Sequence, residues 1–150
     1  MSSNRLCFWS RTLHVFRILE LRPVQEEALL PFIKREDVFA VLPTGCGKSL
    51  IFQLVPKVCS YLHDRGLSYS KAAIVVVICP SNALIDSHIL QLKEHGIPAC
   101  SLADSDLLDD DVASHSIVFT GTELIVREKK WRKVLQSKSF LLLLKRLLSC

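Results

Sequence analysis

The sequence lacks the features that define several common classes of protein. The apolar run near the C-terminus, residues 140–144, is too short to cross a bilayer, and no secretory signal peptide is recognisable. The six cysteines form no Cys-x-x-Cys pair and no zinc-like spacing. Together these absences predict a reducing, intracellular compartment. No Gly-x-Ser-x-Gly motif is present, so serine hydrolase chemistry has no support.

Metal binding has equally little support. The five histidines show no metal-ligand spacing. Five aspartates fall within residues 104–111, but the glycine and the terminal glutamate of a calcium loop are missing. This acidic stretch predicts a solvated loop or the start of a helix.

The composition is typical of one globular domain. The chain has 150 residues, of which 49% are hydrophobic, enough for a sizeable core. Its formal charge of +4 arises from 19 basic and 15 acidic side chains. That mild excess permits a polyanionic partner without requiring one.

A phosphate-binding loop is the most informative motif. Residues 38–42 predict a short buried strand, and Lys48 opens an apolar segment that predicts a helix. Between them, Gly45 and Gly47 let the backbone turn its N–H groups inward around an anion. Lys48 would hold the β- and γ-phosphates of a nucleotide, and the hydroxyl of Ser49 would bind Mg²⁺. The usual first glycine of the motif is replaced by Leu42, which makes this the shorter form of the loop.

Strand and helix patterns alternate along the chain, which predicts a doubly wound α/β fold with a mostly parallel sheet and helices on both faces. The expected strands are residues 38–42, 72–79, 99–102 and 116–120, with 72–79 in a central position. The expected helices begin at Pro23, Lys48, Ala83 and Glu123, with Pro56 as a break or kink in the second. Ser81 or Asn82 should cap the third helix at its start and Gly96 at its end. Thr44, Pro80 and Thr120 should line one rim of the sheet.

Several segments in order resemble the N-terminal half of superfamily 2 helicases, closest to the RecQ-like ATP-dependent DNA helicases. They are residues 21–28, 42–53, 77–85, 91–93 and 96–99. The resemblance spans roughly residues 16–135 and implies a RecA-like P-loop NTPase domain, here expected to be incomplete. It also implies ATP and Mg²⁺ as cofactors, hydrolysis of ATP coupled to 3′-to-5′ unwinding, and single-stranded or forked DNA as the partner. A nuclear location and a role in repair or recombination follow from the same resemblance.

The resemblance assigns roles to individual residues. Arg22 and Gln25 would contact adenine, although Gln25 taken by itself is typical of a solvated helix residue. Lys48 would be the catalytic lysine. The phosphate cradle would consist of Thr44, Gly45, Cys46, Gly47, Lys48 and Ser49. Pro80, Ser81, Asn82, Ala83 and Thr120 would lie against the backbone of a DNA strand.

Three departures from the family pattern limit these expectations. Ile18 stands where an aromatic residue often stacks on adenine, and Thr122 replaces a proline before Glu123. The Asp-Glu-x-His box, which helps to hold Mg²⁺ and directs the attacking water, is absent from the sequence. Without the box and a second RecA-like domain, the 150 residues are expected to bind ATP without turnover.

The expected organisation is an N-terminal extension over residues 1–15, a partial ATP-binding domain over 16–138 and a divergent or truncated tail over 139–150. The alternative is a non-catalytic module, derived from a helicase, that binds ATP, DNA or a protein partner. An unrelated kinase or GTPase fits less well, because the helicase-like segments occur in order and the Asn-Lys-x-Asp motif of GTPases is missing.

Overall fold

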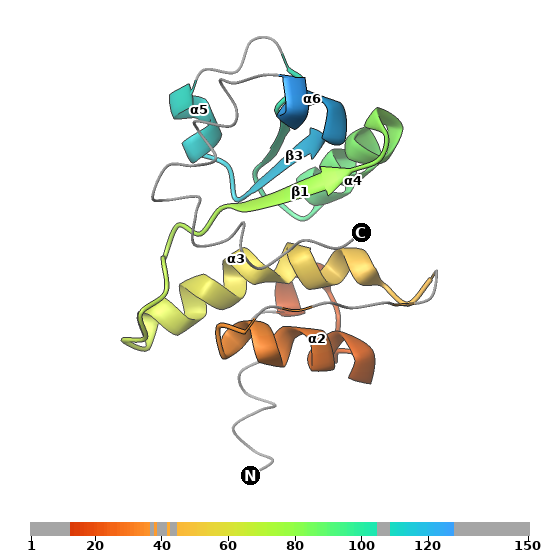
Figure 1. Ribbon diagram of the computed structural model, residues 1–150. Coiled ribbons are helices and arrows are strands. Elements are labelled where there is room, and N and C mark those ends of the chain that lie inside the picture. The colour runs from red at the N-terminus through yellow and green to blue at the C-terminus, as the bar shows by residue number, and fades with distance from the viewer. Residues whose placement is uncertain (1–12, 37, 39–41, 43–44, 105–108, 128–150) are drawn as a thin grey trace. The chain divides into compact units, whose positions relative to one another are not determined.

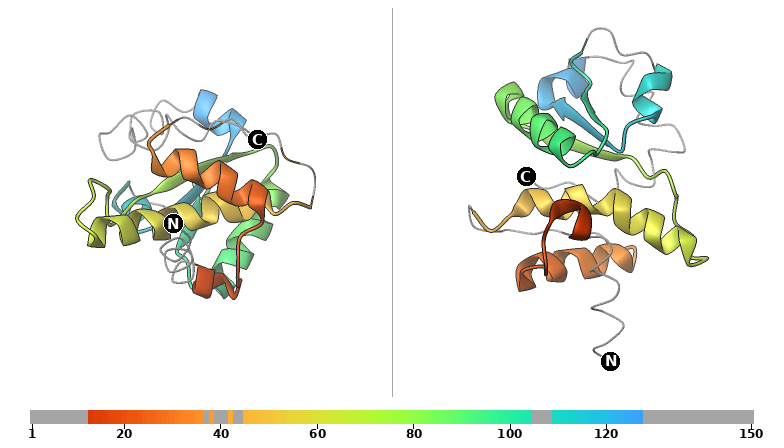
Figure 2. Two further views of the ribbon diagram at one scale, coloured as in Figure 1. Left: turned by 90° about the horizontal axis from the view of Figure 1, so that it is seen from below. Right: turned by 180° about the vertical axis from the view of Figure 1, so that it is seen from behind.

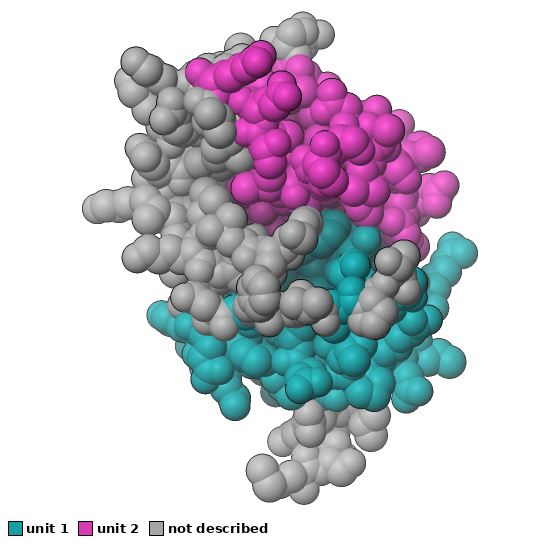
Figure 3. Space-filling view, turned by 45° about the vertical axis from the view of Figure 1, so that its right-hand side comes forward, with its two compact units in different colours: residues 1–73 teal, residues 74–150 magenta. Residues whose placement is uncertain are grey.

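The computed structural model describes residues 13–36, 38, 42, 45–104 and 109–127. The chain divides into two compact units, residues 1–73 and 74–150 (Figure 3), and each is described by itself. The strand predicted for residues 38–42 and the tail from residue 139 lie largely or wholly outside the described residues. Within the described part of the chain, no helix combines the length and apolar character needed to cross a membrane.

The first unit is helical where it is described. It contains the 3₁₀ turn η1 (His14–Phe16) and the helices α2 (Pro23–Ile33) and α3 (Lys48–Asp64). Pro23 occupies the first turn of α2, where its missing N–H costs no hydrogen bond, as the sequence predicts. Leu13, just before η1, is fully buried and belongs to the core.

Helices α2 and α3 lie side by side and run in the same direction (Figure 1). At their N-terminal ends, Gln25 of α2 donates a hydrogen bond to the carbonyl of Gly47, the residue before α3. Beyond their C-terminal ends, the hydroxyl of Tyr69 donates to the carbonyl of Ile33. The pair is therefore fastened at both ends.

Helix α3 continues through Pro56, so the helix predicted from Lys48 is confirmed, and of the predicted break or kink at Pro56 the break is excluded. A proline inside a helix costs about 3 kcal/mol. Seven consecutive or nearly consecutive side chains of this helix are buried, and their burial offsets that cost. They are Gln53, Leu54, Val55, Pro56, Val58, Cys59 and Leu62.

The second unit is a small α/β layer. Its elements are β1 (Val75–Cys79), α4 (Asn82–Glu94), β2 (Ala99–Ser101), α5 (Asp109–Ala113), β3 (Ile117–Gly121) and α6 (Thr122–Arg127). The three strands form a parallel sheet in the order β1-β3-β2. The predicted strands and helices of this region are confirmed where they are described, but β3, and not β1, has the middle position among the described strands.

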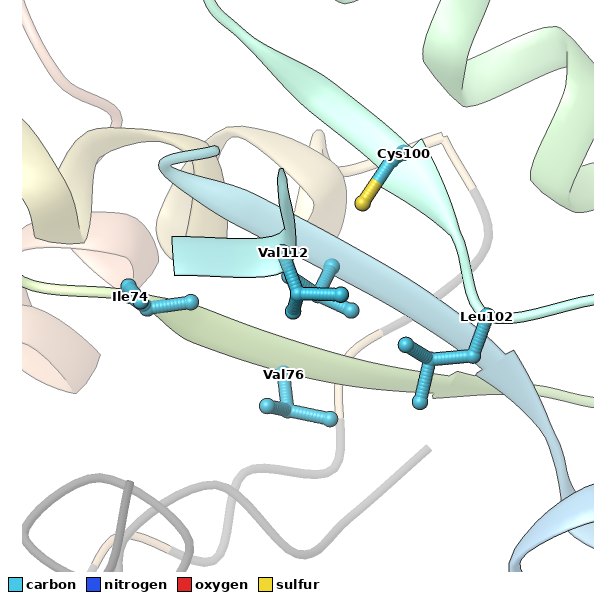
Figure 4. Packing of buried hydrophobic residues seen from close by; sticks show 6 residues of the cluster. Ile74, Val76, Cys100, Leu102 and Val112 are labelled. Carbon is cyan, nitrogen blue, oxygen red and sulfur yellow. The ribbon is translucent and has the colours of Figure 1, made fainter. Parts of the chain in front are cut away.

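Helices cover both faces of this sheet, as predicted. On one face Val76, Val118 and Cys100 lie in one row across the three strands and pack with Val112 of α5 (Figure 4). On the other face α4 packs, and the imidazole of His88 stacks on the ring of Phe119 with centroids 5.6 Å apart and planes 7° from parallel. Each strand is therefore buried on both sides, which is why β1 reads as a continuous β-branched run.

Helix α4 ends in a Schellman motif built on Gly96, as the sequence predicts. Gly96 has a φ of +64°, its N–H bonds the carbonyl of Lys93, and the N–H of Ile97 bonds the carbonyl of Leu92 at 3.0 Å. Leu92 and Ile97 are both buried, which supplies the apolar contact of the motif. The same pattern closes α2 and α3, with Arg35 and Gly66 in the left-handed position.

Candidate nucleotide-binding site

The glycines of the phosphate loop adopt the conformations that the motif requires. Gly45 and Gly47 have φ values of +83° and +79°, which favour glycine strongly over any other residue. Gly47 is the residue before the first turn of α3, so the loop leads directly into the N-terminus of a 17-residue helix. A Cβ atom on Gly47 would lie 2.5 Å from Nε2 of Gln25, whereas one on Gly45 would meet nothing within 4 Å. Gly47 is thus favoured by its φ, and a side chain in its place would also have to displace the amide of Gln25.

Gln25 is buried against this loop and bonds its backbone. Its Nε2 donates to the carbonyl oxygens of Cys46 at 3.2 Å and Gly47 at 3.0 Å. Its Oε1 accepts from the backbone N–H of Arg22 at 3.0 Å, which satisfies the N–H of the residue before α2. Since the carbonyls need a donor and the N–H needs an acceptor, the orientation of the amide is unambiguous.

Two cations reach the carbonyl oxygens of the same loop. Nη1 of Arg22 donates to the carbonyl of Gly45 at 2.9 Å, and Nζ of Lys48 donates to the carbonyl of Leu42 at 3.0 Å. Both side chains are exposed. They lie close to the N–H groups that begin α3, so positive charge gathers at this end of the helix.

The donor set fits a nucleoside triphosphate with Mg²⁺. Ser49 follows Lys48 in the first turn of α3 and is partly exposed, which leaves a hydroxyl at the position of a magnesium ligand. Among the described residues no group of three or more His, Cys, Asp or Glu could hold a metal ion. Ser49 and phosphate oxygens could hold a Mg²⁺ ion here, and Mg²⁺ tolerates few protein ligands because it keeps several waters.

Two predicted residues of the phosphate loop remain, Cys46 and Thr44. Cys46 is a free, partly exposed cysteine whose carbonyl accepts from Gln25. Thr44 lies outside the described residues.

The predicted DNA-contacting residues lie at the carboxyl edge of the sheet in the second unit. Pro80 and the residues up to Ala83 are all exposed; Pro80 and Ser81 connect β1 to α4, and Asn82 and Ala83 begin α4. Ser81 is the N-cap of α4, because its Oγ accepts from the N–H of Leu84 at 3.4 Å. Because Cys79 pairs with Gly121, β1 and β3 end at the same level and α4 and α6 both begin at this edge.

Thr120 differs from the other predicted contacts. It lies within β3, its side chain is fully buried, and its Oγ1 donates to the carbonyl of Gly121. The exposed residue next along the chain is Thr122, the first of α6. The hydroxyl available at this end of β3 is therefore that of Thr122.

Sequence reasoning missed the carbonyl partners of the functional side chains. The helix predicted from Pro23 places Gln25 in its first turn, and the structure confirms that position. Nothing in the sequence indicates that Cys46 and Gly47 accept from its amide, since that contact joins residues more than 20 positions apart.

The fold and the loop define a class: a parallel α/β layer together with a phosphate loop that leads into a helix, as in P-loop nucleotide-binding proteins. Residues 22–143 match the family described as DEAD/DEAH box helicase, and the chain belongs to this family. The match extends beyond residue 138, into the segment expected to diverge.

Similar proteins agree with this assignment. The chain is 37% identical over 89 residues to "ATP-dependent DNA helicase Q1" of Mus musculus. The aligned residues make up 59% of this chain and 12% of that relative. The chain is 31% identical over 129 residues to the Q1 protein of Pongo abelii, covering 85% of the chain and 18% of the relative. The "ATP-dependent DNA helicase Q-like SIM" of Arabidopsis thaliana is 31% identical over 118 residues, covering 75% of the chain and 12% of the relative. The resemblance to RecQ-like helicases is confirmed, and the chain spans less than a fifth of the length of these relatives.

Proposed function

We propose that this chain binds ATP and Mg²⁺ at its phosphate loop, as the nucleotide-binding part of an ATP-dependent DNA helicase of the RecQ type. One observation carries the proposal: Gly47, at a φ of +79° and packed on Gln25, brings the loop into the N-terminus of α3 beside Lys48. A phosphate loop of this kind would direct its N–H groups and Lys48 toward the phosphates, which is what a triphosphate requires. Mg²⁺, held by Ser49 and phosphate oxygens, would neutralise charge on the β- and γ-phosphates.

The 150 residues are proposed to bind ATP without rapid turnover. The sequence contains no Asp-Glu-x-His box, and the described residues offer no other group of carboxylates that could hold the metal and direct water. Binding of ATP and its in-line hydrolysis require different groups. The loop supplies only the groups that bind ATP. This property also supports a second candidate, a non-catalytic module that binds ATP or DNA.

The proposed nucleic-acid surface is the exposed segment from Pro80 to Ala83, which joins β1 to the first turn of α4, with single-stranded or forked DNA as the partner. Backbone N–H groups at the start of α4 and small polar side chains suit phosphate contacts that do not read sequence. Thr120 would support this surface from inside β3 through its bond to Gly121. A nuclear location and 3′-to-5′ polarity rest on the family resemblance alone.

Nucleotide binding is tested by titrating the chain with a fluorescent ATP analogue in the presence of Mg²⁺. Replacing Lys48 with Ala should abolish binding without changing the unfolding temperature measured in the absence of nucleotide, because the lysine side chain is exposed. Lys57→Ala is the matched control, since Lys57 is an exposed lysine of the same helix. Retained binding by Lys48→Ala would remove the phosphate-loop assignment.

Two further measurements test the DNA surface and distinguish between the two candidate functions. Affinity for a single-stranded oligonucleotide should fall as salt rises, because phosphate contacts release counterions. Equal affinity at low and high salt would argue against phosphate contacts. Phosphate release from ATP, measured with and without DNA, should stay at background for the binding module, and stimulation by DNA would instead favour a working motor.

A further inference from the structure

The segment that follows α3 carries an exposed serine between basic residues. Ser68 is exposed and lies outside any helix or strand. Arg65 stands three positions before it and Lys71 three positions after it. Among the serines and threonines of the sequence, only Ser149 also has an arginine three positions before it, and Ser149 lies outside the described residues. Ser68 is therefore the one described hydroxyl with this arrangement of charge.

The spacing of Arg65 and Ser68 is a charge pattern that arginine-directed protein kinases select. Such a pattern can be read only where the backbone is exposed and irregular, because the segment has to enter the kinase. Gly66, with a φ of +78°, turns the chain away from α3, and residues 67–70 form neither helix nor strand. The guanidinium of Arg65 lies 4.8 Å from the ring centroid of Tyr61 and is exposed, so it can meet carboxylates of a kinase.

A second arginine, from the end of α2, reaches the same serine. The guanidinium of Arg35 donates a hydrogen bond to the backbone carbonyl of Ser68 and lies over the ring of Tyr69, 5.0 Å from its centroid. Arg35 has a φ of +63°, the left-handed conformation in which glycine usually ends a helix. An arginine in a position that favours glycine indicates that its side chain has a role, and here the side chain brings a positive charge to Ser68.

We propose that Ser68 is a phosphorylation site for an arginine-directed serine/threonine kinase, and that Arg35 binds the phosphate. The kinase transfers the γ-phosphoryl group of ATP to this chain. The bond between the γ-phosphorus and the β–γ bridging oxygen breaks, a bond from that phosphorus to Oγ of Ser68 forms, and ADP leaves. The hydroxyl proton passes to the catalytic carboxylate of the kinase and then to water. The product carries a charge of about −1.5 to −2 at neutral pH.

The phosphate adds a second tie between α2 and the segment after α3, where the hydroxyl of Tyr69 already donates to the carbonyl of Ile33. Arg35 can donate two parallel, charge-assisted hydrogen bonds to phosphate oxygens. The negative end of the α3 dipole opposes an anion, but this effect falls off within the last turn, and Ser68 lies four positions beyond Asp64, the last residue of the helix. The attraction to Arg35 therefore decides the sign, and the modification stabilises the first unit.

Phosphorylation is tested by incubating the whole 150-residue chain with cyclic-AMP-dependent protein kinase, ATP and Mg²⁺, followed by peptide mapping. Ser68 should be modified, and mapping separates it from Ser149. Ser70 is the internal control, since it is exposed but has Leu67 three positions before it. Arg65→Ala should slow modification of Ser68 by about tenfold or more, which corresponds to about 1.4 kcal/mol. An unmodified Ser68, or equal modification of Ser70, would overturn the assignment of the site.

The role of Arg35 is tested by the unfolding temperature before and after phosphorylation. Phosphate on Ser68 should raise it by about 2–4 °C in the wild-type chain. Arg35→Gly removes the cation and suits the left-handed backbone, and the same modification should then give no rise. Lys34→Ala, which removes the exposed cation next along the chain, is the matched control and should keep the rise. No rise in the wild type, or an equal rise in Arg35→Gly, would show that Arg35 does not bind the phosphate.

Discussion

Gln25 of α2 and Gly47 of the phosphate loop lie in direct contact. Nε2 of Gln25 lies 3.0 Å from the carbonyl oxygen of Gly47, and a Cβ atom added to Gly47 would approach the same nitrogen to 2.5 Å. The glycine therefore has a neighbour on the side where any other residue would carry a side chain. The loop is held by a buried amide as well as by its own backbone preferences.

Replacing Gly47 with Ala should destabilise the chain more than replacing Gly45. Both changes force a residue with a Cβ into left-handed backbone, which costs about 1 kcal/mol. Only Gly47→Ala also displaces Gln25, with two hydrogen bonds worth about 1 kcal/mol each. Thermal or denaturant unfolding without nucleotide measures the difference, and equal losses for the two variants would contradict it.

The cysteines should differ sharply in their reaction with a thiol reagent near neutral pH. Burial, together with the nearby carboxylate of Asp104, raises the pKa of the Cys100 thiol to about 11, so almost no thiolate is present. Cys46 is partly exposed in the phosphate loop, and bound nucleotide should cover it. Peptide mapping after brief labelling should find Cys46 modified, less so with ATP, and Cys100 unmodified. Early modification of Cys100 would show that the sheet of the second unit is open.

Leu92 and Leu90 lie on the same helix, α4, but differ in burial, so they can be compared directly. Leu92 is fully buried and packs at the C-terminal end of the helix, whereas Leu90 is 63% exposed. Leu92→Ala should lower the free energy of unfolding by about 2–5 kcal/mol, because it removes buried methyl groups and leaves a cavity. Leu90→Ala should change it by no more than about 0.5 kcal/mol. Chemical denaturation of both variants measures the contrast, and similar losses would mean that α4 packs through a different face.

His88 should make the chain less stable in mild acid. Burial against the sheet lowers the pKa of its imidazole, and a hydrogen bond with Gln91 opposes part of this shift. The folded state therefore binds the proton less well than the unfolded state, so stability is lost as pH falls below about 6.5, the ordinary value for histidine. His88→Phe keeps a ring on Phe119 but cannot titrate. The unfolding temperature of the variant should decrease less than that of the parent between about pH 7.5 and 5.5. Equal decreases would exclude His88 as the cause.

The sequence predicted most of the described elements because their signals are local. The β-branched run ending at Cys79 forms β1, and Gly96 ends α4, since both depend on neighbouring residues alone. The sequence left open whether Pro56 breaks or kinks α3, for the opposite reason. Its local cost is real, but the burial of Leu54, Val58 and their neighbours is a tertiary effect that the helix pattern does not measure.

The candidate site was predictable in its residue types and not in its connections. The spacing of Gly45, Gly47 and Lys48 specifies a phosphate loop because the conformation of each glycine is a local requirement. The bond from Gln25 to the loop depends on how α2 lies beside α3, which no local pattern encodes. The burial of Thr120 is likewise a consequence of the position of β3 in the middle of the described sheet.

The parallel course of α2 and α3, visible from two sides in Figure 2, has an electrostatic consequence for the first unit. Each helix carries roughly half a positive charge at its start and half a negative charge at its end. Since the like ends lie together, the two macrodipoles repel one another at both ends of the pair. At the C-terminal end Arg35 and Arg65 offset this repulsion permanently, each held over a tyrosine ring. At the N-terminal end Glu26 in the first turn of α2 offsets part of it, whereas the first turn of α3 holds no acidic residue, so an anion bound there would relieve repulsion that the folded chain otherwise retains.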